Sequence, residues 1–264
     1  MAMKLAFSTL GCPEWSWTDI YSMAFDLGYS GIEIRGLGEE ITASRAKPFL
    51  PDEISRTRDT LDNLSLIVSC FSSNCVLSSE SGARIAMTEI SEYISLAQKM
   101  RSPYVRVLAD GNPAPSGEVD DEKITQLLRE LSLKTVGTGV TLLVETNGAY
   151  ADTKRLLRLI EAVNSPAVAV LWDIHHPYRY FGETPEETWE NVGKYIRYVH
   201  VKDSVMDASG KVSYRLPGTG DLPLFSAFTQ LQKNQYDGYV SLEWVKRWSA
   251  EIEDAAVVFP QFVS

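Results

Sequence analysis

Short runs of β-branched, aromatic and other apolar residues recur along the chain at regular intervals. Eight such runs occur, at residues 4–9, 31–35, 65–70, 104–108, 141–146, 167–173, 198–203 and 238–244. Each has the length and composition of a buried strand. The pattern therefore predicts eight strands.

The segments between these runs have the spacing of amphipathic helices. In residues 17–29, one helix face would carry Ile20, Met23, Ala24 and Leu27. Comparable segments predict further helices at residues 53–64, 81–100, 120–139, 152–163, 184–196, 222–234 and 250–263. Strands and helices thus alternate over the whole chain.

Eight strand–helix units in 264 residues are typical of a single (β/α)8 TIM barrel. A doubly wound sheet is the alternative, because the alternation does not reveal the order of the strands. No linker-like segment interrupts the pattern. We therefore expect one domain, spanning residues 1–264.

Polar residues stand at or near the ends of the last four predicted strands. They are Glu145, Asp173, His200 and Glu243, each preceded by mostly apolar residues. In a TIM barrel the carboxyl ends of the strands meet at one face, where catalytic residues gather. A buried carboxylate is costly unless something pairs with it. The pattern predicts that these four side chains converge.

Three carboxylates and one imidazole form a ligand set for a divalent cation. Mn²⁺, Mg²⁺, Co²⁺ and Zn²⁺ all suit it, and ligand type alone does not decide among them. Each residue alone has a simpler interpretation, as a helix cap, a salt-bridge partner or an exposed side chain. Their occurrence on four consecutive strands favours the metal site.

Composition limits the partners of the protein. The formal net charge is −10, and no run of basic residues would form a groove for nucleic acid. No apolar stretch is long enough to span a membrane. The three cysteines have no metal-ligand spacing, as expected in a reducing compartment. We expect a cytoplasmic protein that binds neither nucleic acid nor membrane.

Several motifs resemble those of the xylose isomerase-like TIM barrels, a superfamily of sugar isomerases and epimerases that includes AP-endonuclease-2-like proteins. The matching pieces are GIEIR at 31–35, LLVETNG at 142–148, WDIHH at 172–176, HVKDS at 200–204, and PGTGDLPL at 217–224 ahead of YVSLEW at 239–244. Each motif is weak by itself. Together, in this order, they are specific for the superfamily and for no single substrate.

The resemblance implies roles for individual residues. Glu145, Asp173, His200 and Glu243 would hold one divalent metal ion, and the two glutamates would also act as an acid/base pair. His176 matches a position that contacts the substrate. His175 is expected to pack elsewhere, since only one of two neighbouring histidines on an extended segment can face the barrel mouth.

Other candidates for substrate binding are weaker. Glu33 and Arg35 end the second strand, where they would contact substrate, order the metal ligands or pair with each other in the barrel wall. Arg106 and Asn147 would donate hydrogen bonds to substrate oxygens. Lys202 lies on the same strand face as His200, and would bind a substrate oxygen or phosphate or pair with an acid.

The leading hypothesis is a metal-dependent isomerase or epimerase that abstracts a proton next to the carbonyl of a sugar, sugar phosphate or keto-inositol, through an enediolate. A metal-dependent dehydratase of a keto-polyol such as an inosose starts with the same step and remains an alternative. A non-catalytic carbohydrate-binding barrel is a third reading. A DNA-repair endonuclease would need a trinuclear metal site rich in histidine. The chain has only three histidines and an acidic net charge, which disfavour that function. Exposed aromatic residues such as Trp248 are compatible with a homo-oligomer.

Overall fold

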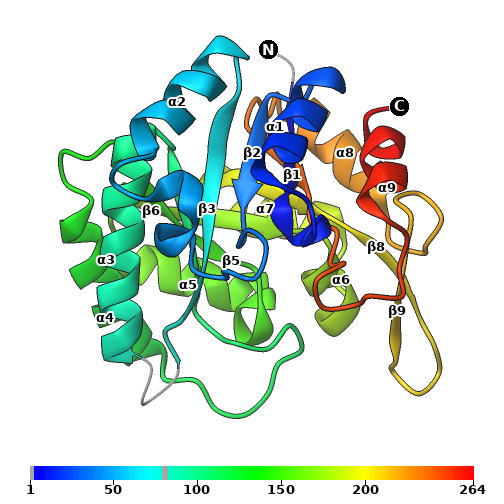
Figure 1. The fold of residues 1–264 in the computed structure, drawn as a ribbon. Helices are drawn as coiled ribbons and strands as arrows, with labels where there is room; N and C mark the ends of the chain where they lie inside the picture. The colour runs from blue at the N-terminus through cyan, green and yellow to red at the C-terminus, as the bar shows by residue number, and fades with distance from the viewer. Residues whose placement is uncertain (1–2, 79–82) are drawn as a thin grey trace.

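The computed structural model describes residues 3–78 and 83–264 and contains a closed, parallel eight-stranded barrel (Figure 1). In spatial order the strands are β1, β10, β7, β6, β5, β4, β3 and β2. Their bounds are β1 Lys4–Ser8, β2 Gly31–Ile34, β3 Ile67–Val76, β4 Tyr104–Leu108, β5 Thr141–Glu145, β6 Val168–Asp173, β7 Ile196–Val201 and β10 Tyr239–Leu242. This confirms the predicted TIM barrel and rules out the doubly wound sheet.

Helices surround the barrel in the order that the amphipathic segments predict. They are α1 Trp17–Asp26, α2 Ile54–Asn63, α3 Ala83–Met100, α4 Asp121–Lys134, α5 Thr153–Val163, α7 Pro185–Val192, α8 Leu224–Lys233 and α9 Ala255–Val263. Residues 81–82 of the predicted third helix lie outside the described residues. No helix in the described part of the chain is long and apolar enough to cross a bilayer.

Short 3-10 helices lie in several of the connections. They are η1 Thr9–Gly11, η2 Ala43–Arg45, η3 Lys47–Phe49, η4 Gly148–Ala151 and η5 Gly193–Tyr195. Local sequence fixes some helix starts: a capping box between Ser16 and Asp19 begins α1, and one between Thr184 and Glu187 begins α7.

Three elements differ from the sequence-based expectation. The segment expected to be extended after β6 is a short helix, α6 (His175–Phe181). An antiparallel hairpin of β8 (Asp203–Met206) and β9 (Val212–Arg215) follows β7 and projects from the barrel at the lower right of Figure 1. The third strand does not end at Cys70 but continues to Val76.

Side chains that point into the barrel form two layers. The lower one, here called the apolar layer, consists of Ala6, Cys70, Leu143, Ala169, Leu171, Tyr198 and Tyr239. Side chains alternate along a strand, so the next inward position lies two residues further on. Glu145, Asp173 and His200 stand at that position, two residues beyond Leu143, Leu171 and Tyr198, and Glu243 stands four residues beyond Tyr239. These four polar residues are here called the ligand layer.

Candidate metal centre and active site

The carboxyl ends of four neighbouring strands bring the ligand layer together. One ligand atom from each of its four residues lies within 4.8 Å of the others, and all four residues are buried. The strands β5, β6, β7 and β10 that carry them are consecutive around the barrel. Asp173 and His200 are direct register partners between β6 and β7. The topology therefore supplies the convergence that the strand ends predict.

His200 is held from behind by a carboxylate. Its Nε2 lies 3.0 and 2.9 Å from the two carboxylate oxygens of Glu33. Ser72 Oγ and Ser241 Oγ donate to the same carboxylate, at 2.6 and 2.7 Å. A buried acid that accepts from one imidazole nitrogen fixes the ring and its tautomer, as carboxylates behind metal-bound histidines do.

The other nitrogen of His200 faces the two glutamates. His200 Nδ1 lies 3.7 Å from Glu145 Oε1 and 3.4 Å from Glu243 Oε1. This buried atom has no hydrogen-bond partner among the described residues. A buried polar atom is rarely left unpaired. An imidazole nitrogen directed at carboxylate oxygens fits a divalent cation, so the residues present suit the group that the sequence implies.

The charges in the ligand layer are strongly coupled. Burial raises the pKa of Glu243, but Lys202 and His200 outweigh it and lower that pKa to about 2. Burial also raises the pKa of Glu145, and Arg106 and His200 reverse the shift, so that its pKa falls below the ordinary range. Both glutamates are therefore ionised at neutral pH.

The pKa of His200 is shifted in the opposite direction to those of the two glutamates. Burial lowers its pKa, but the negative charges of Glu33 and Glu243 raise it well above the ordinary range. Without a metal, the imidazole therefore carries a second proton in the midst of the carboxylates. His200 would have to lose this proton in order to hold a divalent cation, because a metal-ligating histidine must be neutral.

Lys202 pairs with two members of the ligand layer. Its Nζ donates to Asp173 Oδ2 and to Glu243 Oε2, and its side chain is almost fully buried. Of the two roles expected for Lys202, the described structure shows the pairing with acids. The side chain also lines the central cavity, so its ammonium group remains within reach of a substrate.

The two histidines of the DIHH motif begin a helix, so the expectation of an extended segment is wrong. His176 Nδ1 donates to the carbonyl oxygen of Thr146 at 3.0 Å, which leaves Nε2 as an acceptor. His176 lines the central cavity. His175 turns away, with Nε2 2.9 Å from Ser204 Oγ. The different environments of the two rings follow from helical rather than extended geometry.

A cavity of about 290 Å³ opens above the ligand layer. Strands of the barrel, the connections after them and the helix α6 supply its lining residues, which are Leu10, Arg35, Arg106, Leu108, Gly111, Pro113, Glu145, Asn147, His176, Lys202, Tyr214, Glu243, Val245, Trp248 and Ser249. The size is that of a small-molecule site. It brings the two glutamates together with five of the six residues expected to contact substrate: Arg35, Arg106, Asn147, His176 and Lys202.

The remaining expected residues differ in position. Glu33 does not line the cavity but lies behind His200, which supports its role in ordering the ligands. Asn147 lines the cavity, yet its Nδ2 donates to the carbonyl oxygens of Asp110 and Asn112 at 2.7 and 3.1 Å. Only its side-chain oxygen is left for a substrate, as an acceptor rather than the expected donor. Arg106 Nε lies 3.3 Å from Glu145 Oε2.

Two aromatic residues of the cavity lining were not expected from the sequence. Tyr214 belongs to β9 of the unpredicted hairpin, and Trp248 follows β10 in an irregular segment. The hairpin is anchored by Asp203, whose Oδ2 accepts from the backbone N–H groups of Gly218 and Gly220 at 2.9 Å each. No local pattern marks these residues, because a distant loop brings them to the site.

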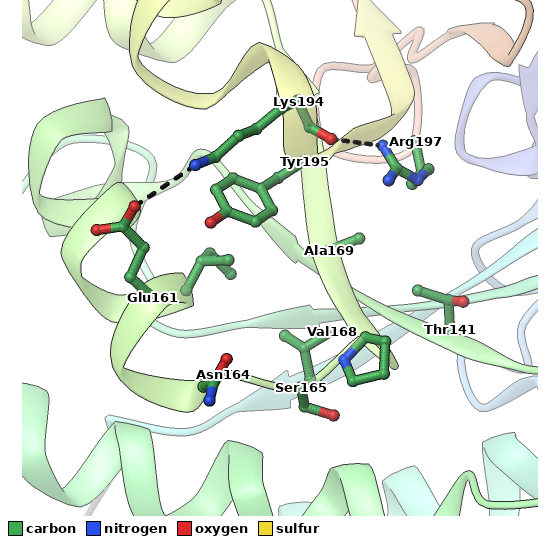
Figure 2. Close-up of a pocket in the computed structure, with 11 residues that line it drawn as sticks. Thr141, Glu161, Asn164, Ser165, Val168, Ala169, Lys194, Tyr195 and Arg197 are labelled. Atoms are coloured by element: carbon green, nitrogen blue, oxygen red, sulfur yellow. Dashed lines mark hydrogen bonds and ion pairs between the residues drawn. The ribbon is translucent and has the colours of Figure 1, made fainter.

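A larger cavity, of about 600 Å³, lies at the opposite end of the barrel (Figure 2). It adjoins the first residues of β5 and β6, Thr141 and Val168. Its charged residues include Lys194 and Glu161, which form an ion pair at 3.6 Å and are both exposed. The lining contains no member of the ligand layer. Size alone therefore does not identify the reactive end.

Known proteins resemble this chain over nearly its whole length. Fructoselysine 3-epimerase from Shigella flexneri is 24% identical over 267 residues, which cover 94% of this chain and 92% of that protein. The probable 3-DHS dehydratase AsbF from Bacillus anthracis superposes with a TM-score of 0.80 at 17% identity, covering 99% and 97% of the two chains.

A crystal structure of the IolI protein with a bound zinc atom also superposes with a TM-score of 0.80, at 18% identity and covering 99% and 96% of the two chains. At such identities these structures show a shared fold. A sequence model of the family described as xylose isomerase-like TIM barrel matches residues 22–259. The chain therefore belongs to the xylose isomerase-like TIM barrel family.

Proposed function

We propose that the protein is a divalent-metal-dependent sugar isomerase or epimerase that moves a proton next to a carbonyl group. Glu145, Asp173, His200 and Glu243 would hold the metal ion, and Glu145 and Glu243 would transfer the proton. The similarity to fructoselysine 3-epimerase supports an enzyme of this class acting on a sugar. The zinc atom in the IolI structure supports a metal site, with Mn²⁺, Mg²⁺, Co²⁺ and Zn²⁺ all compatible.

The arrangement of the two glutamates carries this proposal. They come from β5 and β10, three positions apart around the barrel, and both line the same cavity. Both are ionised at neutral pH, so either is competent as a base. For isomerisation, one carboxylate would carry the proton from one carbon to its neighbour. For epimerisation, the second carboxyl group would return a proton to the opposite face.

Other residues of the cavity would position the substrate. His176 Nε2 is an acceptor and would take a hydrogen bond from a substrate hydroxyl group. Lys202 would donate to a substrate oxygen and help to stabilise the negative charge of an enediolate. A divalent cation held by the ligand layer would supply further positive charge to stabilise the enediolate.

A dehydratase is a second candidate, supported by the structural similarity to the probable 3-DHS dehydratase. Elimination of water begins with the same proton abstraction, so the same glutamate would act as the base. The two reactions differ in the mass of the product. An isomer keeps the substrate mass, whereas dehydration removes one molecule of water.

Solvent deuterium uptake tests the proposal. The protein would be loaded with Mn²⁺ in D₂O and given free and phosphorylated ketoses and keto-inositols, with NMR and mass spectrometry as readouts. We expect deuterium at a carbon next to a carbonyl, and loss of uptake with a chelator or in Asp173→Asn. The exposed Glu161 provides the control variant Glu161→Gln, which should keep wild-type uptake.

Three results would contradict or change the proposal. Absence of uptake across the panel, with metal binding shown by calorimetry, would favour a carbohydrate-binding barrel. Absence of metal binding in the folded wild-type protein would show that the four residues of the ligand layer do not hold a metal ion. A product lighter by one water would replace isomerisation with dehydration and retain the proton abstraction.

A further inference from the structure

Three cationic side chains line the cavity beside the glutamates: Arg35, Arg106 and Lys202. Lys202 is paired with two acids of the ligand layer. The two arginines are less completely paired. Arg35 Nη1 and Arg106 Nε are buried and have no hydrogen-bond partner among the described residues, and the two residues are only 7% and 4% exposed.

Each arginine is held in place by a neighbour. Arg35 Nη2 donates to Asn74 Oδ1 on the extended part of β3, and its guanidinium carbon lies 5.8 Å from the ring centre of Trp248. Arg106 lies against Glu145, at 3.3 Å. Arg35 is therefore fixed by an amide and an aromatic ring, and its second terminal nitrogen is left without a partner.

The positive charge of Arg106 disfavours that of Arg35. Burial lowers the pKa of Arg35, and the positive charge of Arg106 lowers it further, to about 10. Arg35 is still a cation at neutral pH. A buried cation with an unpaired N–H group is costly unless an anion reaches it. Glu243 and Glu145 favour the charge of Arg35, but no described carboxylate forms an ion pair with it, so a ligand in the cavity is the group that would complete the site.

The charge balance of the whole site points in the same direction. The ligand layer and Glu33 contribute four carboxylates, against the three cations of the cavity wall. With a divalent ion bound and His200 neutral, these four negative charges would face five positive charges, an excess of one positive charge. The loaded site would then favour a substrate with a single negative charge over a neutral one.

We propose that the substrate is a compact sugar or polyol bearing an anionic group, a carboxylate or a phosphate, and that Arg35 and Arg106 bind that group. The guanidinium fork matches both groups, because it donates two parallel hydrogen bonds to their oxygens. The cavity of about 290 Å³ limits the substrate to about the size of a monosaccharide. This inference rests on the proposed function for the reacting end of the substrate.

A matched pair of unreactive ligands tests the anion site without turnover. D-Gluconate and D-glucitol differ at one end, where a carboxylate replaces a hydroxymethyl group. Calorimetry on the metal-loaded protein should show that gluconate binds about 10- to 100-fold more tightly, the range expected for hydrogen bonds to charged groups. D-Glucitol 6-phosphate in the same assay distinguishes a phosphate site from a carboxylate site.

Variants of Arg35 locate the effect. In Arg35→Met the preference for gluconate over glucitol should fall to near one, and in Arg35→Lys, which keeps the charge without the fork, it should be intermediate. The control is Arg101→Met, a change of the same kind at an exposed arginine that pairs with Asp62 at the surface. Equal affinity for the two ligands, or a preference that persists in Arg35→Met, would overturn the inference.

A second assay uses reactive sugars, D-fructose, D-fructuronate and D-fructose 6-phosphate, which share a ketone and differ at C6. Deuterium uptake should be faster with an anionic member, and Arg35→Met should reduce this advantage. Uptake with fructose that equals uptake with both anionic sugars would overturn the inference and leave the proposed function intact. A gluconate preference without uptake by any sugar of the wider panel would contradict the proposed function and leave the anion site.

Discussion

The interior of the barrel changes character within two residues along the same strands. On β6, Leu171 belongs to the apolar layer and Asp173 to the ligand layer, and on β7 the same holds for Tyr198 and His200. At about 3.3 Å per residue, the two layers are about 7 Å apart. The apolar layer excludes water beneath the charges. Charges in such a dry, fixed setting act more strongly on a substrate than they would in water.

This comparison predicts that changes in the upper layer affect chemistry, whereas changes in the lower layer affect stability. It also predicts that the surface at the opposite end of the barrel affects neither strongly. Five substitutions test this division, in decreasing order of the expected free-energy change.

The largest effect is expected for the two glutamates of the ligand layer. Glu145→Gln and Glu243→Gln each remove a carboxylate that would transfer a proton, so each should lower turnover by about 10²- to 10⁴-fold. Single-turnover deuterium uptake on the metal-loaded variants measures this loss. Full activity in both variants, with circular dichroism unchanged, would show that neither glutamate moves the proton.

A substitution in the apolar layer should act on stability instead. Leu171 is fully buried beneath Asp173. Leu171→Ala should lower the free energy of unfolding by about 2–5 kcal/mol, through lost burial and the cavity that is left. Urea denaturation measures the change, and calorimetry should still find one bound metal ion. A variant that keeps its stability and loses the metal would refute the division between the layers.

Glu33 contacts His200 of the ligand layer without belonging to that layer, and its substitution should give an intermediate effect. Glu33→Gln keeps the shape of the side chain but weakens its hold on His200 Nε2, so metal affinity should fall by about 10- to 100-fold, as for other partners of metal-bound histidines. Metal titration by calorimetry measures this. An unchanged affinity would mean that Ser72 and Ser241 hold the site without the carboxylate charge.

The sequence predicts the residues of the ligand layer better than the residue that holds His200 in place. The ligand layer was predictable because its residues interrupt apolar runs at strand ends, where topology brings them together. For Glu33 the sequence left three roles open, because Glu33 stands 167 residues away from His200 in the chain and no local pattern shows which residue it contacts. The cellular location and oligomeric state remain predictions.

The helix α6 was missed for a local reason. The residue before a proline disfavours helical geometry, and His176 precedes Pro177. In the structure, Asp173 Oδ1 accepts from the backbone N–H of His175 at 2.8 Å and so stabilises the start of the helix. The carboxylate of a candidate metal ligand thus also shapes the chain that follows it, a contact that residue preferences do not encode.

The smallest effect is expected at the larger cavity, at the opposite end of the barrel. Glu161 and Lys194 face each other across it (Figure 2), but both are exposed, with side-chain exposures of 52% and 66%. Water screens such a pair, so Glu161→Gln should change the free energy of unfolding by less than about 1 kcal/mol. Metal affinity and deuterium uptake should not change, because no member of the ligand layer borders this cavity. Urea denaturation and the uptake assay on the same preparation measure both. A loss of uptake in this variant would mean that the two ends of the barrel are coupled, and the division between a reactive end and a structural end would then fail.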